Sequence, residues 1–213
     1  ASDVYKRQDL FCGAGGFSYG MHKNSHFKTV VAIDFNEKAA DTFKKNMPDT
    51  EVIVGDITDD KTKDRIITES KLKGVNMIIG GPPCQGFSMK GKKLGLNDPR
   101  NFLFMEYLNL VQEIQPEVFV IENVKSLLNT AGGWFKDEIL NYIHKLGYKV
   151  QYGVLNAKKF GVPQARERAI FICSKHKDIT LPKGTESIVT VRDAISDLAY
   201  LQSAEGEFEQ EYI

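Results

Sequence analysis

The sequence predicts an α/β protein built on a doubly wound, mostly parallel sheet. Short β-branched runs alternate with amphipathic stretches along most of the chain, which is the order typical of βαβ units. The runs VNMIIGG and EVFVIEN are apolar throughout rather than alternating, as expected of strands that are covered on both faces. With 213 residues, 42% of them hydrophobic and 26% charged, the chain is long enough for one globular domain or slightly more.

Six strands and three helices follow from these patterns. The strands are expected at Thr29–Phe35, Glu51–Val54, Val75–Ile79, Val118–Glu122, Lys149–Leu155 and Ala169–Cys173. Helices are expected where apolar side chains recur three or four positions apart. These sets are Ala39, Ala40, Phe43 and Met47, then Phe104, Tyr107, Leu108, Val111 and Ile114, then Phe135, Ile139, Ile143 and Leu146.

The N-terminus does not fit this rhythm. A central strand should precede Leu10, yet Lys6-Arg7-Gln8 is polar where such a strand would be apolar. Either the strand is short and begins near Leu10, or residues 1–8 are an atypical, non-native end. We favour the second interpretation.

At the other terminus, residues 201–213 carry alternating glutamates and are expected to form an acidic, solvated tail.

Composition excludes several classes of protein. The 28 basic residues balance 28 acidic ones, so the overall charge does not indicate nucleic acid. No apolar run reaches the roughly 18 residues that span a bilayer, and no signal peptide is evident, so we expect a cytoplasmic protein without membrane contact. Cys12, Cys84 and Cys173 are odd in number and widely spaced, which fits neither a disulfide framework nor a metal site.

A glycine-rich loop, FCGAGGF, follows Asp9-Leu10 and precedes an expected helix. Its glycines Gly13, Gly15 and Gly16 permit tight turning and close backbone approach to a ligand. Ser18 stands where the dinucleotide fingerprint has its third glycine, and no P-loop Gly-Lys-Ser/Thr is present. The loop alone therefore indicates either a tight turn or a nucleotide site.

Acidic residues at two further strand ends favour the nucleotide site. Asp34 lies 21 residues after Gly13, where α/β folds place a carboxylate against ribose hydroxyls, although Asp34 would also suit a helix N-cap. Phe35 beside it can stack on adenine. Asp56 follows the next strand and can accept a hydrogen bond from the adenine amino group, with Ile57 supplying an apolar contact.

Cys84 follows the next apolar strand within GGPPCQGFS. Prolines fix φ and hold the preceding residue extended, so Pro82 and Pro83 present this thiol rigidly at the exit of a strand. A packing thiol needs no such frame, and we interpret Cys84 as a nucleophile. Cys12 and Cys173 are expected to be buried core thiols.

Two further polar groups lie at strand ends. Glu122, followed by Asn123, ends the run EVFVIEN and is either a helix cap or an acid/base. Gln164, Arg166 and Arg168 alternate before an apolar strand, so in an extended segment all three would point to one face. A ligand or plain exposure would account for these arginines.

Taken together, these motifs resemble the ordered motifs of the DNA (cytosine-5)-methyltransferases. DLFCGAGGFSYG, GPPCQGFS, ENV and QARER occur in this order, with GDI after the third strand and a match over NAKKFGVP. The resemblance covers about Asp9 to Leu198. It implies a Rossmann-like methyltransferase fold that uses S-adenosyl-L-methionine, with residues 9–200 as the catalytic domain.

The resemblance also implies a role for each residue. Cys84 would add to carbon 6 of cytosine, Glu122 would hold or protonate ring nitrogen 3, and Arg166 and Arg168 would contact the base and its phosphate. Pro83 and Asn123 would hold the base edge or the loop. Cofactor contacts would come from Phe11, Gly13, Gly15, Gly16, Asp34, Phe35, Asp56, Ile57 and Pro83.

Such chemistry requires the cytosine to be flipped out of double-stranded DNA. The polar loop at 85–101 would then act as a basic lid, unless it is only a solvated run of charge. The expected nucleic-acid contacts are Gln85, Ser88, Lys90, Lys92, Arg100, Asn123 and Gln164.

In this family a target-recognition region and two further motifs follow, and residues 201–213 would be either the acidic tail or the start of that region. We expect weak cofactor binding and methylation by these 213 residues alone. We also expect a monomer that works beside a cognate restriction endonuclease. The alternatives are a transfer-RNA cytosine-5 methyltransferase, a catalytically inactive cofactor-binding module and a Rossmann oxidoreductase, which Ser18 disfavours.

Overall fold

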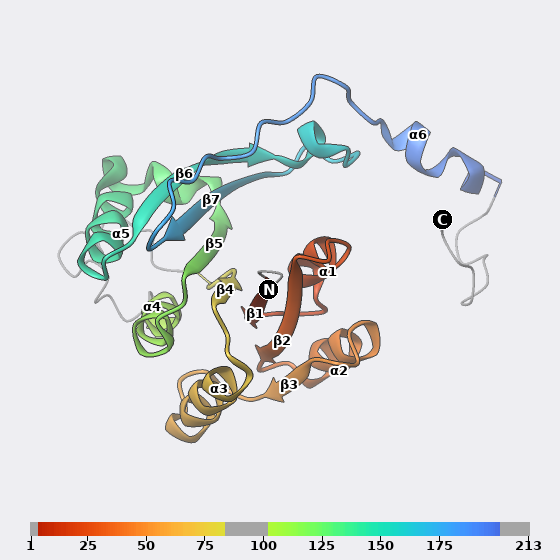
Figure 1. Cartoon of the computed structure of the whole chain (residues 1–213). Coiled ribbons are helices and arrows are strands. Elements are labelled where there is room, and N and C mark those ends of the chain that lie inside the picture. The colour runs from red at the N-terminus through yellow and green to blue at the C-terminus, as the bar shows by residue number, and fades with distance from the viewer. Residues whose placement is uncertain (1–3, 84–101, 201–213) are drawn as a thin grey trace. The chain divides into compact units, whose positions relative to one another are not determined.

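The computed structural model describes residues 4–83 and 102–200. The chain divides into two compact units, which we describe separately. The first comprises residues 1–154 and 168–181, and the second comprises residues 155–167 and 182–213. The first unit contains a sheet with helices packed on it (Figure 1).

The sheet has seven strands in the order β3-β2-β1-β4-β5-β7-β6. Strands β1 to β5 pair in parallel, and β7 runs antiparallel to β5. The expected doubly wound, mostly parallel sheet is therefore confirmed. The strands are β1 (Tyr5–Leu10), β2 (Phe27–Asp34), β3 (Glu51–Val54), β4 (Met77–Gly80), β5 (Val118–Val124), β6 (Lys149–Asn156) and β7 (Glu167–Ser174).

The chain reverses its winding direction beside β1. It proceeds outward from β1 through β2 to β3, then returns to place β4 and β5 on the other side of β1. Leu10 pairs with both Ile33 and Gly80, so the carboxyl ends of β1, β2 and β4 lie level. In open α/β sheets, ligands bind outside the strands' carboxyl ends at such a reversal.

Helices cover both faces of the sheet, as the apolar strands require. The three helices expected from apolar spacing are confirmed as α2 (Glu37–Asn46), α4 (Phe102–Ile114) and α5 (Trp134–Lys145). The glycine loop is followed, as expected, by the short helix α1 (Gly16–His22). Two 3-10 turns, η4 (Lys125–Leu128) and η5 (Thr130–Gly133), lead into α5.

Helix α3 (Asp60–Lys73) was not evident from apolar spacing, because only Ile66 and Ser70 among its 14 residues are buried. Its signals lie instead at its ends. The Asp59 side chain caps the first turn by accepting from Thr62 N, and Gly74 ends the helix with a φ of 68°. An acidic N-cap and a left-handed C-terminal glycine are sequence signatures of helix boundaries.

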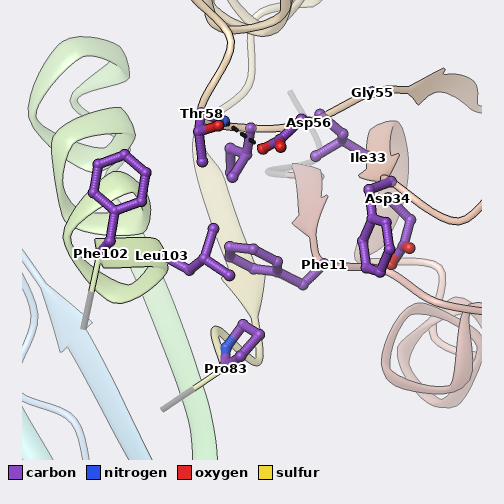
Figure 2. Close-up of a pocket in the computed structure, with 11 residues that line it drawn as sticks. Phe11, Ile33, Asp34, Gly55, Asp56, Thr58, Pro83, Phe102 and Leu103 are labelled. Atoms are coloured by element: carbon purple, nitrogen blue, oxygen red, sulfur yellow. Dashed lines mark hydrogen bonds between the residues drawn. The ribbon is translucent and has the colours of Figure 1, made fainter. Parts of the chain in front are cut away.

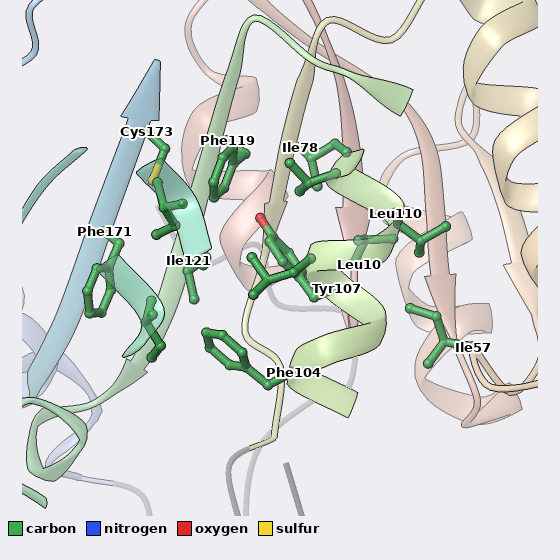
Figure 3. Close-up of a cluster of buried hydrophobic side chains, with 14 of the residues drawn as sticks. Leu10, Ile57, Ile78, Phe104, Tyr107, Leu110, Phe119, Ile121, Phe171 and Cys173 are labelled. Atoms are coloured by element: carbon green, nitrogen blue, oxygen red, sulfur yellow. The ribbon is translucent and has the colours of Figure 1, made fainter. Parts of the chain in front are cut away.

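The larger core cluster lies between the sheet and helices α3, α4 and α5, and Figure 3 shows part of it. Phe104 and Tyr107 of α4 are fully buried, and the Tyr107 hydroxyl donates to the Val120 carbonyl oxygen at 2.9 Å. On the opposite face, Phe43 of α2 packs with Ala32, and α1 covers the neighbouring strands. No helix within the described residues is long and apolar enough to cross a membrane.

The second unit has little regular structure among residues 155–167 and 182–200. It contains η6 (Ala157–Phe160), α6 (Val191–Ile195) and η7 (Ser196–Leu198). Its two chain segments are joined by Thr185, whose backbone N donates to the Lys159 carbonyl oxygen at 2.7 Å. Helix α6 begins with a reciprocal capping box between Thr190 and Asp193.

Strand β1 differs from expectation. It begins at Tyr5, so the alternative of a short strand starting near Leu10 is wrong. The favoured interpretation, that residues 1–8 are a non-native end, stays a prediction. Arg7 and Gln8 are fully buried in this central strand. Arg7 donates to Thr29 Oγ1 at 2.6 Å, but no described residue pairs with its Nε or Nη1, or with either amide atom of Gln8. Burial lowers the pKa of Arg7 to about 10.

We predict that Gln8→Leu stabilises the protein. Burying an unpaired side-chain amide costs about 1–3 kcal/mol, and leucine supplies apolar contacts in its place. The free energy of unfolding, measured by urea denaturation, should rise by about 1–3 kcal/mol. The matched control is Gln112→Leu on the exposed side of α4, which should give no such gain. A loss of stability in Gln8→Leu would contradict the burial described here.

Candidate active site

A pocket of ≈ 460 Å³ opens at the carboxyl edge of the sheet (Figure 2). Its walls come from the ends of β1, β2 and β3, from the segment after β4 and from the first turn of α4. It is lined by Phe11, Ile33, Asp34, Phe35, Gly55, Asp56, Ile57, Thr58, Pro83, Phe102 and Leu103. Six of these, namely Phe11, Asp34, Phe35, Asp56, Ile57 and Pro83, were expected from sequence at a cofactor site.

Asp34 is held by backbone donors on two sides. Its Oδ2 accepts from Gly13 N at 2.8 Å, and its Oδ1 accepts from Asn36 N at 2.9 Å. The helix-cap alternative for Asp34 is wrong, because Asn36 caps α2 by accepting from Ala39 N. Each carboxylate oxygen retains a free lone pair, so the group can still accept from two ligand hydroxyls.

The glycine loop shapes the pocket more than it lines it. Phe11 has a φ of 59°, Gly13 of 52° and Gly15 of 94°, so the chain turns through left-handed conformations that L-residues rarely adopt. A Cβ on Gly15 would lie 2.9 Å from both Met47 and Phe43 of the α2 region. Gly13, Gly15 and Gly16 are not among the lining residues, and Phe11 is the loop's contribution to the wall.

The Asp56 side of the pocket combines one exposed carboxylate with a buried apolar residue. Asp56 Oδ1 accepts from Thr58 N at 2.9 Å, and Ile57 beside it is 4% exposed. Asp56 is exposed, which leaves its second oxygen accessible to a ligand.

Sequence reasoning missed five lining residues. Ile33 and Gly55 flank predicted positions, and Thr58 follows one, so adjacency to the strand ends is the signal that could have found them. Phe102 and Leu103 begin α4, and Figure 2 shows Leu103 pointing toward Phe11. No local motif marks these two as pocket residues, because their place depends on how α4 packs on the sheet.

Glu122 and Arg168 form an ion pair at the same edge of the sheet. Arg168 Nε lies 2.8 Å from Glu122 Oε1, and both side chains are about a quarter exposed, at 27% and 29%. The two residues are diagonal neighbours across the antiparallel β5–β7 pair, because Glu122 pairs with Ile170 and Val124 with Arg168. The sequence motifs single out both residues, and the structure adds that the two side chains pair.

The segment after β4 passes between the pocket and this ion pair. A Cβ on Gly81 would lie 3.1 Å from Glu122 Oε2, so a glycine lets the carboxylate approach the backbone. Buried Asn123 donates from Nδ2 to the Pro82 carbonyl oxygen at 2.9 Å, and its Oδ1 accepts from Val124 N. Of the two roles considered for Asn123, this geometry supports holding the loop.

Gln164 and Arg166 precede β7 and belong to the second unit. The expected extended run from Gln164 is wrong, because Gln164 N donates to the Val162 carbonyl and Arg166 N donates to the Gln164 carbonyl. These successive three-residue turns mean that the backbone from Val162 to Arg166 is turned rather than fully extended. Cys84, Gln85, Ser88, Lys90, Lys92, Arg100 and the rest of the expected lid lie outside the described residues.

The two other cysteines have no reactive character, as expected. Cys12 is 6% exposed and Cys173 is fully buried. Burial raises the pKa of both thiols, and the carboxylates of Asp9 and Asp34 add to the effect at Cys12. Neither thiol is primed for nucleophilic chemistry.

Asp9 is a buried carboxyl group behind the pocket. It is 1% exposed, and Ser18 Oγ donates to its Oδ2 at 2.6 Å. Burial raises the pKa of Asp9 to about 7, opposed by the Ser18 hydrogen bond and the Arg7 charge and assisted by the charge of Asp34.

This fold and site define an α/β protein with a pocket at the carboxyl edge of its sheet and a glutamate–arginine ion pair at the same edge. A model of the family described as C-5 cytosine-specific DNA methylase matches residues 5–210. The chain belongs to this family. The resemblance found in the sequence motifs is thereby confirmed.

Several proteins in this family are similar to the chain. Type II methyltransferase M1.HphI of Haemophilus parahaemolyticus is 41% identical over 202 residues, which cover 93% of this chain and 54% of that protein. M.DdeI of Desulfomicrobium norvegicum is 40% identical over 96% of this chain and 51% of that protein. M.AquIA of Picosynechococcus is 43% identical over 76% of this chain and 69% of that protein. The chain spans about half the length of M1.HphI and of M.DdeI.

Solved structures share the fold. A proposed DNA modification methyltransferase encoded within an E. coli prophage superposes with a TM-score of 0.73 at 29% identity, over 90% of this chain and 54% of that one. Dnmt2 methyltransferase of S. pombe superposes with a TM-score of 0.64 at 21% identity, over 97% and 57%. The second likeness supports the fold alone.

We predict that Asp9 makes the stability of the protein fall as pH rises. Its folded pKa of about 7 exceeds the ordinary value of 3.8, so between these values the folded state binds more protons than the unfolded state. The contribution of Asp9 is therefore greatest near pH 4 and is lost as pH rises through 7. The difference in unfolding free energy between wild type and Asp9→Asn should fall from pH 5 to pH 8.

Urea denaturation at several pH values measures this difference. The matched control is Asp64→Asn on the exposed face of α3, for which the difference from wild type should stay level. A level difference for Asp9→Asn as well would contradict the raised pKa.

Proposed function

We propose that this protein transfers a methyl group from S-adenosyl-L-methionine to carbon 5 of cytosine in DNA, through a covalent adduct with Cys84. Family membership supports the reaction class. The names of the Type II methyltransferase relatives support a role in restriction and modification. We further propose that it acts as a monomer on double-stranded DNA, alongside a cognate restriction endonuclease.

One juxtaposition carries this proposal. The Glu122–Arg168 ion pair and the nucleoside-type pocket share one edge of the sheet, and the Gly81–Pro83 segment connects them. Pro83 lines the pocket and is followed directly by Cys84. A nucleophile at position 84 would therefore directly follow a residue of the cofactor pocket, in the segment that connects this pocket to the Glu122–Arg168 ion pair.

The pocket's donor set fits the adenosyl part of the cofactor. A volume of ≈ 460 Å³ with carboxylates at separate strand ends and aromatic walls suits a nucleoside. Asp34 would accept from the ribose hydroxyls, Phe11 and Phe35 would pack on the adenine, and Asp56 would accept from its amino group beside Ile57. When bound, this cofactor supplies an electrophilic methyl group.

The remaining chemistry belongs to residues of the chain. The Cys84 thiolate would bond to carbon 6 of cytosine while Glu122 holds a proton at ring nitrogen 3, which makes carbon 5 an enamine-type nucleophile. Arg168 keeps the Glu122 carboxylate oriented and contributes positive charge at the base. After methylation, loss of the carbon 5 proton to a base re-forms the ring double bond and expels the thiolate.

The target cytosine would have to leave the DNA stack to reach these groups. We propose that Gln85, Ser88, Lys90, Lys92 and Arg100 contact the DNA, because they follow Cys84 in a basic segment. We also propose that Gln164 and Arg166 contact the DNA. Phosphate contacts by such residues predict binding that weakens as salt increases.

We predict that the protein forms a covalent adduct with DNA containing 5-fluorocytosine. Fluorine at carbon 5 blocks the proton loss that would release Cys84, so even a slow enzyme accumulates the adduct in a single turnover. The measurement is a shifted, denaturant-resistant band after incubation with the DNA and S-adenosylmethionine. Cys84→Ser should give no adduct, whereas Cys173→Ala should retain it.

The alternatives give different outcomes in the same assay. An adduct on transfer RNA carrying the same base, but not on DNA, would support a transfer-RNA methyltransferase. Cofactor binding without an adduct on either nucleic acid would support a catalytically inactive binding module.

We predict that Glu122→Gln slows adduct formation by about 10²-fold or more, the usual effect of removing a positioned acid or base. Glutamine keeps the shape of the side chain but cannot hold a transferable proton at nitrogen 3. S-adenosylhomocysteine affinity, measured by calorimetry, should stay near the wild-type value. The matched control is Glu117→Gln, an exposed residue just before β5, which should trap at the wild-type rate. Equal rates for both variants would contradict the role of Glu122.

A further inference from the structure

Among the described residues, Asp9 carries the most deeply buried acidic side chain, and neither the pocket lining nor the proposed chemistry uses it. It is 1% exposed and lies in β1, on the face that α1 covers. Transferring a carboxylate from water to a protein interior is costly unless hydrogen bonds compensate for the loss of hydration. The contacts of Asp9 therefore indicate what its burial accomplishes.

Those contacts lead directly to α1. Ser18, in the first turn of that helix, is fully buried and donates from Oγ to Asp9 Oδ2 at 2.6 Å. Thr29 of β2 donates from Oγ1 to Ser18 Oγ at 3.1 Å. Arg7 donates to the Ser18 carbonyl oxygen at 3.2 Å and to Thr29 Oγ1 at 2.6 Å. The start of α1 is thus tied to β1 and β2 by buried polar groups.

Between Asp9 and Ser18 runs the glycine loop. Gly15 of this loop is the N-cap residue of α1, and it provides no side-chain hydrogen bond to that helix. Phe11 is held at a φ of 59°, a strained conformation for a non-glycine residue that persists only when the surroundings enforce it. The Asp9–Ser18 bond joins the two ends of this loop and supplies such a constraint.

The loop in turn sets two features of the pocket. Phe11 forms part of its wall, and Gly13 N donates to Asp34 Oδ2 at 2.8 Å. We propose that Asp9 is a positioning residue whose hydrogen bond with Ser18 closes the glycine loop and so fixes Phe11 and the Gly13–Asp34 contact for cofactor binding. This inference rests on the proposed function, because it assigns the pocket to S-adenosylmethionine.

The test compares variants that break the bond with one that keeps it. Asp9→Ala and Ser18→Ala remove a partner, whereas Asp9→Asn retains an oxygen that can accept from Ser18. We expect Ser18→Ala and Asp9→Ala to raise the S-adenosylhomocysteine Kd by about tenfold, as the loss of one buried hydrogen bond would. The double variant should be no weaker than the single ones, and Asp9→Asn should stay within about twofold of wild type.

A matched control separates positioning from general destabilisation. Thr50 Oγ1 donates to the Thr29 carbonyl oxygen at 3.1 Å, and its residue is also buried. Thr50→Val loses a buried hydroxyl hydrogen bond outside the glycine loop. It should lower the melting temperature without changing the Kd, measured by calorimetry well below the unfolding transition.

Hydrogen exchange in the absence of ligand provides a second measurement. The Gly13 amide should exchange faster in Ser18→Ala than in wild type or Thr50→Val. A wild-type protein that binds neither S-adenosylmethionine nor S-adenosylhomocysteine would refute the proposed function, and exchange at Gly13 would still decide the positioning role. Unchanged exchange, or wild-type affinity in Ser18→Ala where wild type binds, would overturn the inference.

Discussion

The Asp34 carboxylate receives a backbone N–H from each side, from Gly13 of the glycine loop and from Asn36 before α2. The hydrogen bond from Gly13 joins the end of β1 to the end of β2, which the sheet already holds level through the Leu10–Ile33 pair, and the bond from Asn36 orients the carboxylate within the turn after β2. The pocket depends on this junction, because it sets the distance between the Phe11 wall and the β2 wall. A carboxylate is suited to this task because it accepts several hydrogen bonds at once.

Much of this arrangement could be predicted from sequence because strand ends carry their own signals. β3 was predicted at the residues where it occurs, and β2, β4, β5, β6 and β7 within two residues at each end. Asp34 at the end of β2 and Asp56 just after β3 were predicted as pocket residues, since parallel strands bring their carboxyl ends to one edge. The ion pair involves two residues that the motifs had singled out.

The features that could not be predicted from sequence have physical causes of their own. β1 could not be predicted from periodicity, because Arg7 and Gln8 are polar and the sheet buries them regardless. Alternation placed Gln164 and Arg166 in an extended segment, but the local turns near Val162 override it. Phe102 and Leu103 enter the pocket only through the packing of α4, a long-range effect that no short motif encodes.

The reversed direction of β7 makes the charged pair sensitive to alignment. Arg168 meets Glu122 as a diagonal neighbour, two positions along from its direct partner. Because side chains alternate across a strand, sliding β7 by a single residue would send the guanidinium to the opposite side of the sheet. Adding or deleting one residue within β7 would then abolish the pair while most of the ladder re-forms. The pairing of β5 with β7 therefore constrains the number of residues in β7, independently of which amino acids are used.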